Sequence, residues 1–310
     1  SYTEPATQPA PETAREGTPV GHGERERCTL HSLLNKKFLL ILIAAAALRL
    51  GLVFTAQGIN ADAYQYALTA ERMADRGVTA GLRGDFFYPH NELNRRLVVY
   101  PLLGRMFLPI TGDPVLALRL VSALAGVGVV CVTYLLAREL FETEGIALLS
   151  AAIVAFHHEF ARAAASIYRE VLMAFFVTLA LLILIRTLRA KGRRRTALAV
   201  TVGVVCFVAF LTRPEGIFLL LCLGAVALFF GFPLTLKRRL AVCGAMVVAF
   251  AALEAPYVLW MRAETGHWMA SQWQIKRRTL EAEGTWPDDL TREYIMNNYV
   301  KERTDGRSAH

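Results

Sequence analysis

The stretch that decides the fold is FLLILIAAAALRLGLVFTAQ, residues 38–57, which is apolar along its length apart from Arg49 and its last residue, Gln57. A helix needs ~20 mostly apolar residues to cross a bilayer, so this stretch predicts a membrane span. Further apolar runs predict six more spans, at 114–137, 145–156, 171–185, 197–211, 216–232 and 240–260. The run at 145–156 is the weakest of these, because polar HHEF follows it at once. We therefore expect an all-α polytopic membrane protein with seven transmembrane helices.

The overall composition agrees with a membrane protein. The 310 residues are 55% hydrophobic and 19% charged, with a mean hydropathy of +0.37. Soluble domains are roughly 25% charged, and their apolar residues are not gathered into long blocks. The composition excludes a disordered chain and a collagen. A disulfide-stapled secreted fold is also excluded, since four of the five cysteines lie inside apolar runs. It also disfavours a nucleic-acid binder, because the basic runs behind the net charge of +8 fall between predicted spans.

The basic clusters also predict an orientation. They precede the first span, separate the fourth from the fifth and separate the sixth from the seventh. By the positive-inside rule, all three lie in the cytoplasm, which places the C-terminus outside. We expect a disordered cytoplasmic tail at 1–36, a membrane module at 37–262 and an external segment at 263–310. The first external loop, about 58–113, is expected to hold short juxtamembrane helices.

The balance of basic residues bears on the source and the cellular location. Arginine outnumbers lysine 28 to 6. This ratio suits a GC-rich bacterial genome and hence a bacterial inner membrane, with the endoplasmic reticulum as the alternative.

Ionisable residues from several separate segments converge on the external end of this topology. The first loop contributes Asp62, Tyr64, Arg95 and Arg96, the start of the fourth span contributes Arg169 and Glu170, and the turn after the fifth contributes Arg213 and Glu215. A carboxylate near an acceptor is suited to general base catalysis, and arginines are suited to hold a phosphate. Together they favour a membrane-edge site for a lipid phosphate. The alternative is that they are helix caps, snorkelling arginines and structural ion pairs.

Five short motifs lie in order around these residues. They are DAYQYALTAE at 62–71, RRLVVYPLL at 95–103, ALRLVSAL at 117–124, RE at 169–170 and LTRPEG at 211–216. In kind and order they resemble the GT-C glycosyltransferases, in particular the protein O-mannosyltransferase and lipid A aminoarabinose transferase branch. The resemblance runs from about residue 49 to residue 272. No single motif is specific, but the five together are.

The resemblance implies a transferase that moves a sugar from a polyprenyl-phosphate donor to an acceptor on the external face, with inversion. It implies that Asp62 is the general base and that Glu170 orients the acceptor or shares that role. Arg95, Arg96 and Arg213 would hold the lipid phosphate, with Tyr64 and Glu215 as further substrate-binding candidates. It implies no resident cofactor and no metal ligand set, and it leaves open whether a divalent metal assists.

The chain also departs from the family pattern. Members often carry His-Pro-Pro where this chain has NELNRR at 91–96, and His157-His158 stand where a proline is common. Members usually have eleven or more spans and a soluble C-terminal domain. Three readings follow: a minimal enzyme, an enzyme whose acceptor module comes from a partner membrane protein, or a member without activity.

Two other functions compete with the transferase. One is a non-catalytic structural subunit of a membrane complex, built on the same seven spans. The other is a transporter or flippase, which would need polar residues across the bilayer midplane. The fifth and sixth spans, AVTVGVVCFVAFL and IFLLLCLGAVALFF, carry almost none. No internal repeat supports an inverted-repeat transporter either.

Overall fold

A computed structural model describes residues 35–55, 61–78, 98–231 and 234–265, and all the regular structure in these ranges is helical. Five helices are long and apolar enough to cross a membrane. They are α2 (Lys36–Thr55), α6 (Pro114–Phe141), α9 (Arg169–Arg189), α10 (Gly192–Thr212) and α12 (Leu236–Thr265). The all-α, multi-pass membrane fold is thus confirmed.

The other two predicted spans are helical but differ from simple crossings. Helices α7 (Glu144–Phe156) and α8 (His158–Ala164) meet at a bend of 62°, so they make a sixth span only when counted as one broken helix. Helix α11 (Gly216–Phe230) has 15 residues, fewer than a straight crossing requires. A count of seven full spans is therefore not established, although a helix occupies each of the seven predicted places.

The buried side chain of Arg49 explains how the break between α7 and α8 is tolerated. Carbonyl groups at a helix end lack intrahelical partners, and lipid offers none. The Arg49 guanidinium donates to the carbonyl oxygens of Ala155 at 3.0 Å and Val154 at 3.2 Å, the last turn of α7. The same group lies 5.5 Å from the ring centre of Phe160 in α8. This charge inside a span therefore supports the broken helix.

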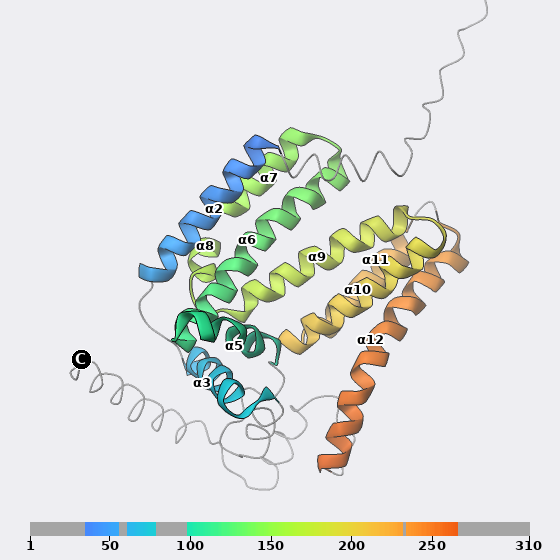
Figure 1. The fold of residues 1–310 in the computed structure, drawn as a ribbon. Helices are drawn as coiled ribbons and strands as arrows, with labels where there is room; N and C mark the ends of the chain where they lie inside the picture. Colours follow the sequence, from blue (N-terminus) through green and yellow to red (C-terminus); the bar gives the residue numbers. More distant parts are fainter. Residues whose placement is uncertain (1–34, 56–60, 79–97, 232–233, 266–310) are drawn as a thin grey trace, which may run out of the picture.

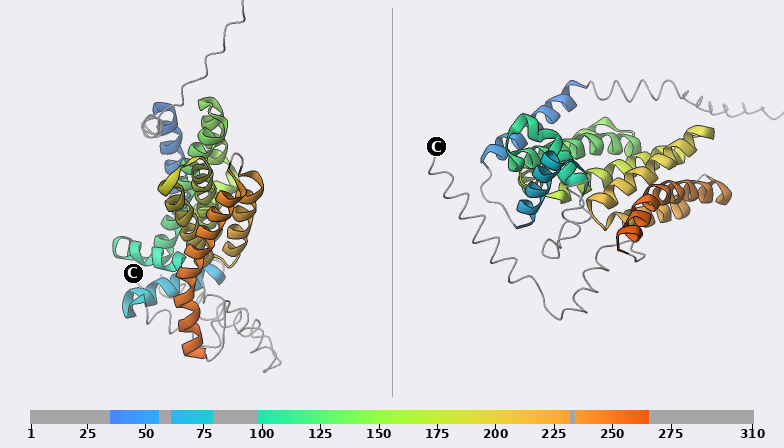
Figure 2. Two further views of the ribbon diagram at one scale, coloured as in Figure 1. Left: turned by 90° about the vertical axis from the view of Figure 1, so that its right-hand side faces the viewer. Right: turned by 60° about the horizontal axis from the view of Figure 1, so that its bottom comes forward.

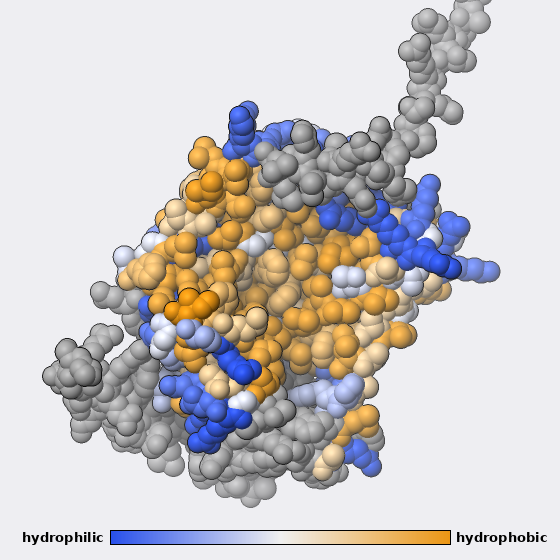
Figure 3. Space-filling view, in the orientation of Figure 1, coloured by the Kyte–Doolittle hydropathy of each residue, from blue (hydrophilic) through white to orange (hydrophobic). Residues whose placement is uncertain are grey.

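The long helices alternate in direction, so the helix bundle has two opposite ends (Figures 1 and 2). One, the basic end, holds the starts of α2, α7, α10 and α12. There Glu139, near the end of α6, accepts from Arg186 at 2.8 Å and from Arg189 at 3.0 Å, both in the last turn of α9. Figure 3 shows a broad hydrophobic band between hydrophilic surface at this end and at the other. This distribution suits a bilayer around the band.

The opposite end, called here the site end, carries the two juxtamembrane helices that the sequence predicts in the first loop. Helix α3 (Ala61–Arg76) and helix α5 (Val99–Thr111) lie across the ends of the long helices (Figure 1). Helix α3 is polar overall but buries Tyr66 and Met73. Gly104 in α5 lets the helix approach α6 closely, since a Cβ there would lie 2.5 Å from Leu118 Cδ2.

Helix α9 joins two separately packed halves of the bundle. Its first turn, with Val171 and Leu172, packs into a core shared with α3, α5, α6 and α8. Its later turns, with Ala180 and Leu184, pack into a second core shared with α10, α11 and α12. Figure 1 shows α9 between α6 and α10. Groups at the start of α9 therefore stand where the two halves meet.

Several predictions lie outside the described residues. They concern the N-terminal tail, the basic pair Arg95 and Arg96, and nearly all of the C-terminal segment. The domain boundaries at 36 and 262 likewise stay predictions.

Candidate active site

The turn between α10 and α11 is shaped by its own sequence, Arg213-Pro214-Glu215-Gly216. A residue before proline is driven to extended backbone, and Arg213 ends α10 with φ −148° and ψ 138°. Gly216 starts α11 against the end of α10, where a Cβ would lie 2.3 Å from the Phe210 backbone nitrogen. Only glycine fits this approach without a shift of backbone. The turn thus holds Arg213 and Glu215 at the site end.

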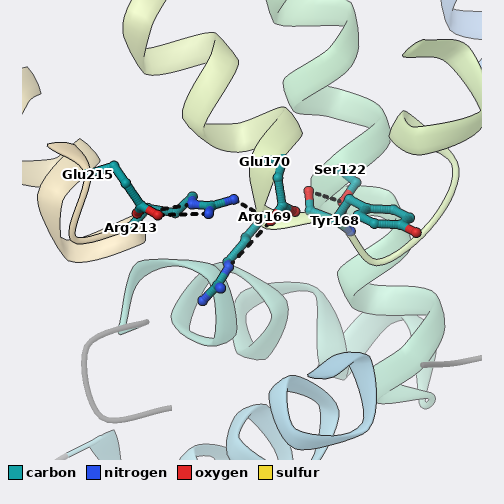
Figure 4. A network of polar contacts seen from close by, with 6 residues as sticks. All are labelled: Ser122, Tyr168, Arg169, Glu170, Arg213 and Glu215. Atoms are coloured by element: carbon teal, nitrogen blue, oxygen red, sulfur yellow. Dashed lines mark hydrogen bonds and ion pairs between the residues drawn. The ribbon is translucent and has the colours of Figure 1, made fainter. Parts of the chain in front are cut away.

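A network of four charged side chains forms between this turn and the start of α9 (Figure 4). Glu215 accepts from Arg213 through both oxygens, with Oε1 2.9 Å from Nη2 and Oε2 3.2 Å from Nε. The remaining nitrogen of Arg213, Nη1, donates to Glu170 Oε1. The same Oε1 lies 3.6 Å from Nε of Arg169. One glutamate oxygen therefore faces two guanidinium groups from different helices.

The pairing of Arg213 with Glu215 favours the charged forms of these two groups. The hydrogen bond from Arg213 lowers the pKa of Glu215 from its ordinary value, against a smaller opposing effect of burial. Glu215 in turn raises the pKa of Arg213. Both groups are therefore ionised at neutral pH. The four charges sum to zero, so the network is neutral as it stands.

Exposure within the network is uneven. The side chains of Arg169 and Arg213 are 20% and 24% exposed, whereas those of Glu170 and Glu215 are 50% and 53% exposed. The arginines thus lie against the protein, and the carboxylates lie toward the outside.

A second, uncharged network holds the start of α9 in place. The fully buried Tyr100 hydroxyl lies 2.6 Å from Ser122 Oγ and donates to the Leu118 carbonyl at 3.1 Å. Ser122 Oγ is 3.4 Å from both the backbone nitrogen and the carbonyl oxygen of Tyr168, the residue before α9. Burial raises the pKa of Tyr100, so it stays a neutral phenol. These contacts fix the backbone that carries Arg169 and Glu170.

Helix α3 connects to the charged network through Tyr66. The guanidinium of Arg169 lies 5.8 Å from the centre of the Tyr66 ring, and this ring meets the Tyr100 ring edge-on at 5.5 Å. Asp62, the predicted base, occupies the first turn of α3, one helical turn before Tyr66, and its side chain lies outside the description. Tyr64 is half-buried in the same turn. The helix that carries Asp62 is thus tied to the network.

The structure brings together three of the seven predicted site residues in direct contact, namely Glu170, Arg213 and Glu215. It places Asp62 and Tyr64 on the adjoining helix, while Arg95 and Arg96 lie outside the described residues. Sequence analysis placed Arg169 at this end beside Glu170 but gave it no role of its own. It also gave no role to Tyr100 and Ser122, whose motif positions were the available signal.

Two arginines inside the spans donate to backbone carbonyl groups. Arg49 supports the α7–α8 break, and Arg119 donates to the Val53 carbonyl at 3.5 Å. His157 accepts from the Phe160 amide at 3.2 Å through Nδ1, which makes it the cap of α8. Among the described residues, no three His, Cys, Asp or Glu side chains gather as metal ligands would.

The sequence matches the profile of one known protein family. The profile described as dolichyl-phosphate-mannose-protein mannosyltransferase matches residues 97–260, more than half of the sequence. The chain belongs to this family. No curated protein and no solved structure matches it.

The family membership makes this protein a membrane glycosyltransferase of the GT-C type, as the motifs predicted. The matched range runs from α5 into α12 and includes the whole charged network. It begins after Asp62 and Tyr64, so the match does not reach the residue that the motif comparison picks as the base.

Proposed function

We propose that this transferase takes its sugar from a polyprenyl-phosphate donor and passes it to an acceptor at the external face of the membrane, with inversion. The observation that carries the proposal is the network of Arg169, Glu170, Arg213 and Glu215 at the site end. It places guanidinium groups where helices reach the edge of the hydrophobic band, and a lipid phosphate whose tail stays in the bilayer would lie at that depth. The family supports the same donor class.

The proposed chemistry needs one base and an anion-binding group. The acceptor nucleophile attacks the anomeric carbon from the face opposite the phosphate and forms the new glycosidic bond. The bond from that carbon to the phosphate oxygen breaks, and the phosphate leaves with the electron pair. Asp62 takes the acceptor proton. The leaving phosphate has a low pKa and needs no acid, but its charge is stabilised by Arg213.

The remaining residues are proposed to support this step. Glu170 orients the acceptor or shares the base role, and Glu215 fixes the fork of Arg213. Tyr64, Arg95 and Arg96 complete the contacts to the substrate. We place the site on the periplasmic face of a bacterial inner membrane, with the basic end in the cytoplasm.

Donor turnover by the reconstituted full chain tests the base. We would supply a synthetic polyprenyl-phosphate mannose and measure release of polyprenyl phosphate by mass spectrometry, with water or a peptide as acceptor. Asp62→Asn is expected to slow release by at least ~10²-fold, the usual effect of losing a general base. Asp75→Asn is the matched control, because Asp75 is an exposed aspartate on the same helix. Wild-type turnover in the Asp62 variant would contradict the assignment.

Native mass spectrometry of the gently purified protein tests the donor class without knowledge of the acceptor. The wild type is expected to retain a polyprenyl phosphate or its sugar, and the bound mass would name the sugar. Arg213→Ala is expected to lose it. A wild type that retains no such lipid, even when supplied in excess, would favour a non-catalytic structural subunit of a membrane complex instead.

A further inference from the structure

We propose that the two guanidinium groups of Arg169 and Arg213 form a phosphate-binding cradle, and that Glu170 occupies this cradle until the donor phosphate displaces it. Arg169 thereby becomes a binding residue for the donor. The inference rests on the proposed function only for the identity of the ligand as the phosphate of a lipid-linked sugar.

The first argument is that Glu170 occupies the place of an anion. Its Oε1 is paired with Arg213 Nη1 and lies 3.6 Å from Arg169 Nε, so two cations from different elements converge on a single oxygen. Carboxylate and phosphate oxygens accept from arginine in the same way. The Glu170 side chain is 50% exposed and more accessible than either arginine. Its displacement therefore requires the movement of a half-exposed side chain and not of a buried one.

The second argument is that both arginines are held by contacts other than Glu170. The Nε and Nη2 edge of Arg213 is taken by the two oxygens of Glu215, which leaves Nη1 directed at the cradle. Arg169 lies over the ring of Tyr66. Departure of Glu170 thus leaves two positioned guanidinium groups with Glu215 as their one remaining counter-charge in the network. Preorganised donors of this kind lower the cost of binding an anion.

The third argument is the position of the cradle at the start of α9. Arg169 and Glu170 are the first two residues of that helix, and the preceding residue, Tyr168, caps none of its amides with a side chain. The positive end of the helix dipole favours a negative group there, which Glu170 now supplies. A phosphate in its place would have the same advantage.

The consequence for catalysis is a coupling between donor binding and Glu170. While the cradle is empty of phosphate, the Glu170 carboxylate is neutralised by the arginines. Once the phosphate enters, the carboxylate is released toward the outside, where the acceptor must arrive. The donor thus makes the second acid available.

Equilibrium binding of radiolabelled farnesyl phosphate to the full chain in lipid nanodiscs tests the cradle. Glu170→Gln keeps the shape of the side chain and removes the competing charge, so the affinity for farnesyl phosphate is expected to rise by about three- to tenfold. The increase is small because an ion pair of a half-exposed carboxylate is weak. Arg169→Gln is expected to weaken binding by about tenfold, the effect of one charged hydrogen bond. Arg169→Lys should recover part of the loss, because lysine keeps the charge but not the fork.

Controls separate the cradle from general charge effects. Glu159 and Arg162 form an exposed pair at 3.9 Å on α8, so Glu159→Gln and Arg162→Gln repeat the charge changes elsewhere. Both are expected to leave binding within twofold of the wild type. Thermal unfolding of each variant would show that the fold is retained.

The outcomes distinguish this inference from the proposed function. If Arg213→Ala loses binding while the Glu170 and Arg169 variants bind like the wild type, the cradle is refuted and the donor assignment stands. If the affinity of the site for inorganic phosphate, measured by competition, equals its affinity for farnesyl phosphate, the site takes free phosphate. The assignment of a lipid-linked donor to this site is then refuted. In turnover assays, Glu170→Gln should lower both KM and kcat, since binding improves while the second acid is lost.

Discussion

Replacement of Tyr100 by phenylalanine removes a single hydroxyl from the buried network behind the site. The ring keeps its edge-on contact with Tyr66, so the change is confined to the hydrogen bonds to Ser122 at 2.6 Å and to the Leu118 carbonyl at 3.1 Å. A net hydrogen bond contributes about 1 kcal/mol, and a buried partner left without it costs about 1–3 kcal/mol. Ser122 Oγ keeps its longer contacts to Tyr168, so we expect about 1–2 kcal/mol of destabilisation in total.

A double-mutant cycle with Ser122→Ala isolates the interaction. The free energies of unfolding of the wild type, the two single variants and the double variant would be measured by denaturant titration in one detergent. The coupling energy is expected to be about 0.5–1.5 kcal/mol, because the two side chains share one short hydrogen bond. Additive single effects, within about 0.3 kcal/mol, would refute the idea that this bond anchors the start of α9. Wild-type donor affinity in Tyr100→Phe would likewise refute its effect on the position of Arg169.

Three further predictions follow from contacts described above. Arg49→Met should destabilise the protein by about 2–4 kcal/mol, because the Val154 and Ala155 carbonyls lose their charged donor inside the membrane, and unfolding measurements should show the loss while Arg162→Met shows none. Gly216→Ala should weaken the retention of lipid phosphate, since the added Cβ displaces the turn that holds Arg213. Unchanged retention of the lipid in native mass spectrometry would contradict this. The pair of Glu215 with Arg213 should stabilise the wild type over Glu215→Gln by no more than about 1 kcal/mol, as befits an exposed carboxylate. The pKa of Glu215 in the folded protein lies below its value in the unfolded chain. The stability difference between the wild type and Glu215→Gln is therefore fully present above the ordinary glutamate pKa and is lost as the pH falls through the lowered pKa. A difference in melting temperature that persists at pH 2 would count against the pair.

The apolar pattern was sufficient to predict the helices because each span needs a long uninterrupted run, and a helix stands at every predicted place. It did not predict the bend after Phe156. The shortness of that run was visible, but the compensation by Arg49 depends on a contact 105 and 106 residues away in the chain. Sequence analysis identified Arg49 only as a charge within the first span. The structure shows that its Nη1 and Nη2 groups donate to backbone carbonyls.

The charged site was predictable in its members but not in its pairing. Depth along each span placed Glu170, Arg213 and Glu215 at one end, and the structure confirms their proximity. The pattern suggested an open arginine for phosphate, whereas the structure shows Arg213 engaged by two carboxylates. Which partner a side chain selects depends on helix rotation, and helices apolar all round give no periodic signal for that rotation. Arg169 was given no role of its own for this reason, since adjacent residues on a helix point in different directions.

The place of α9 between two packed halves has a consequence for how the protein is made. The chain is made and inserted from its N-terminal end, so α2 to α9 precede the Arg213 turn. Until that turn follows, the ion pair of Glu170 with Arg213 cannot form. Arg213 and Glu215 arrive with the second half of the chain. Nascent chains that stall after α9 should thus lack the proposed donor-binding network.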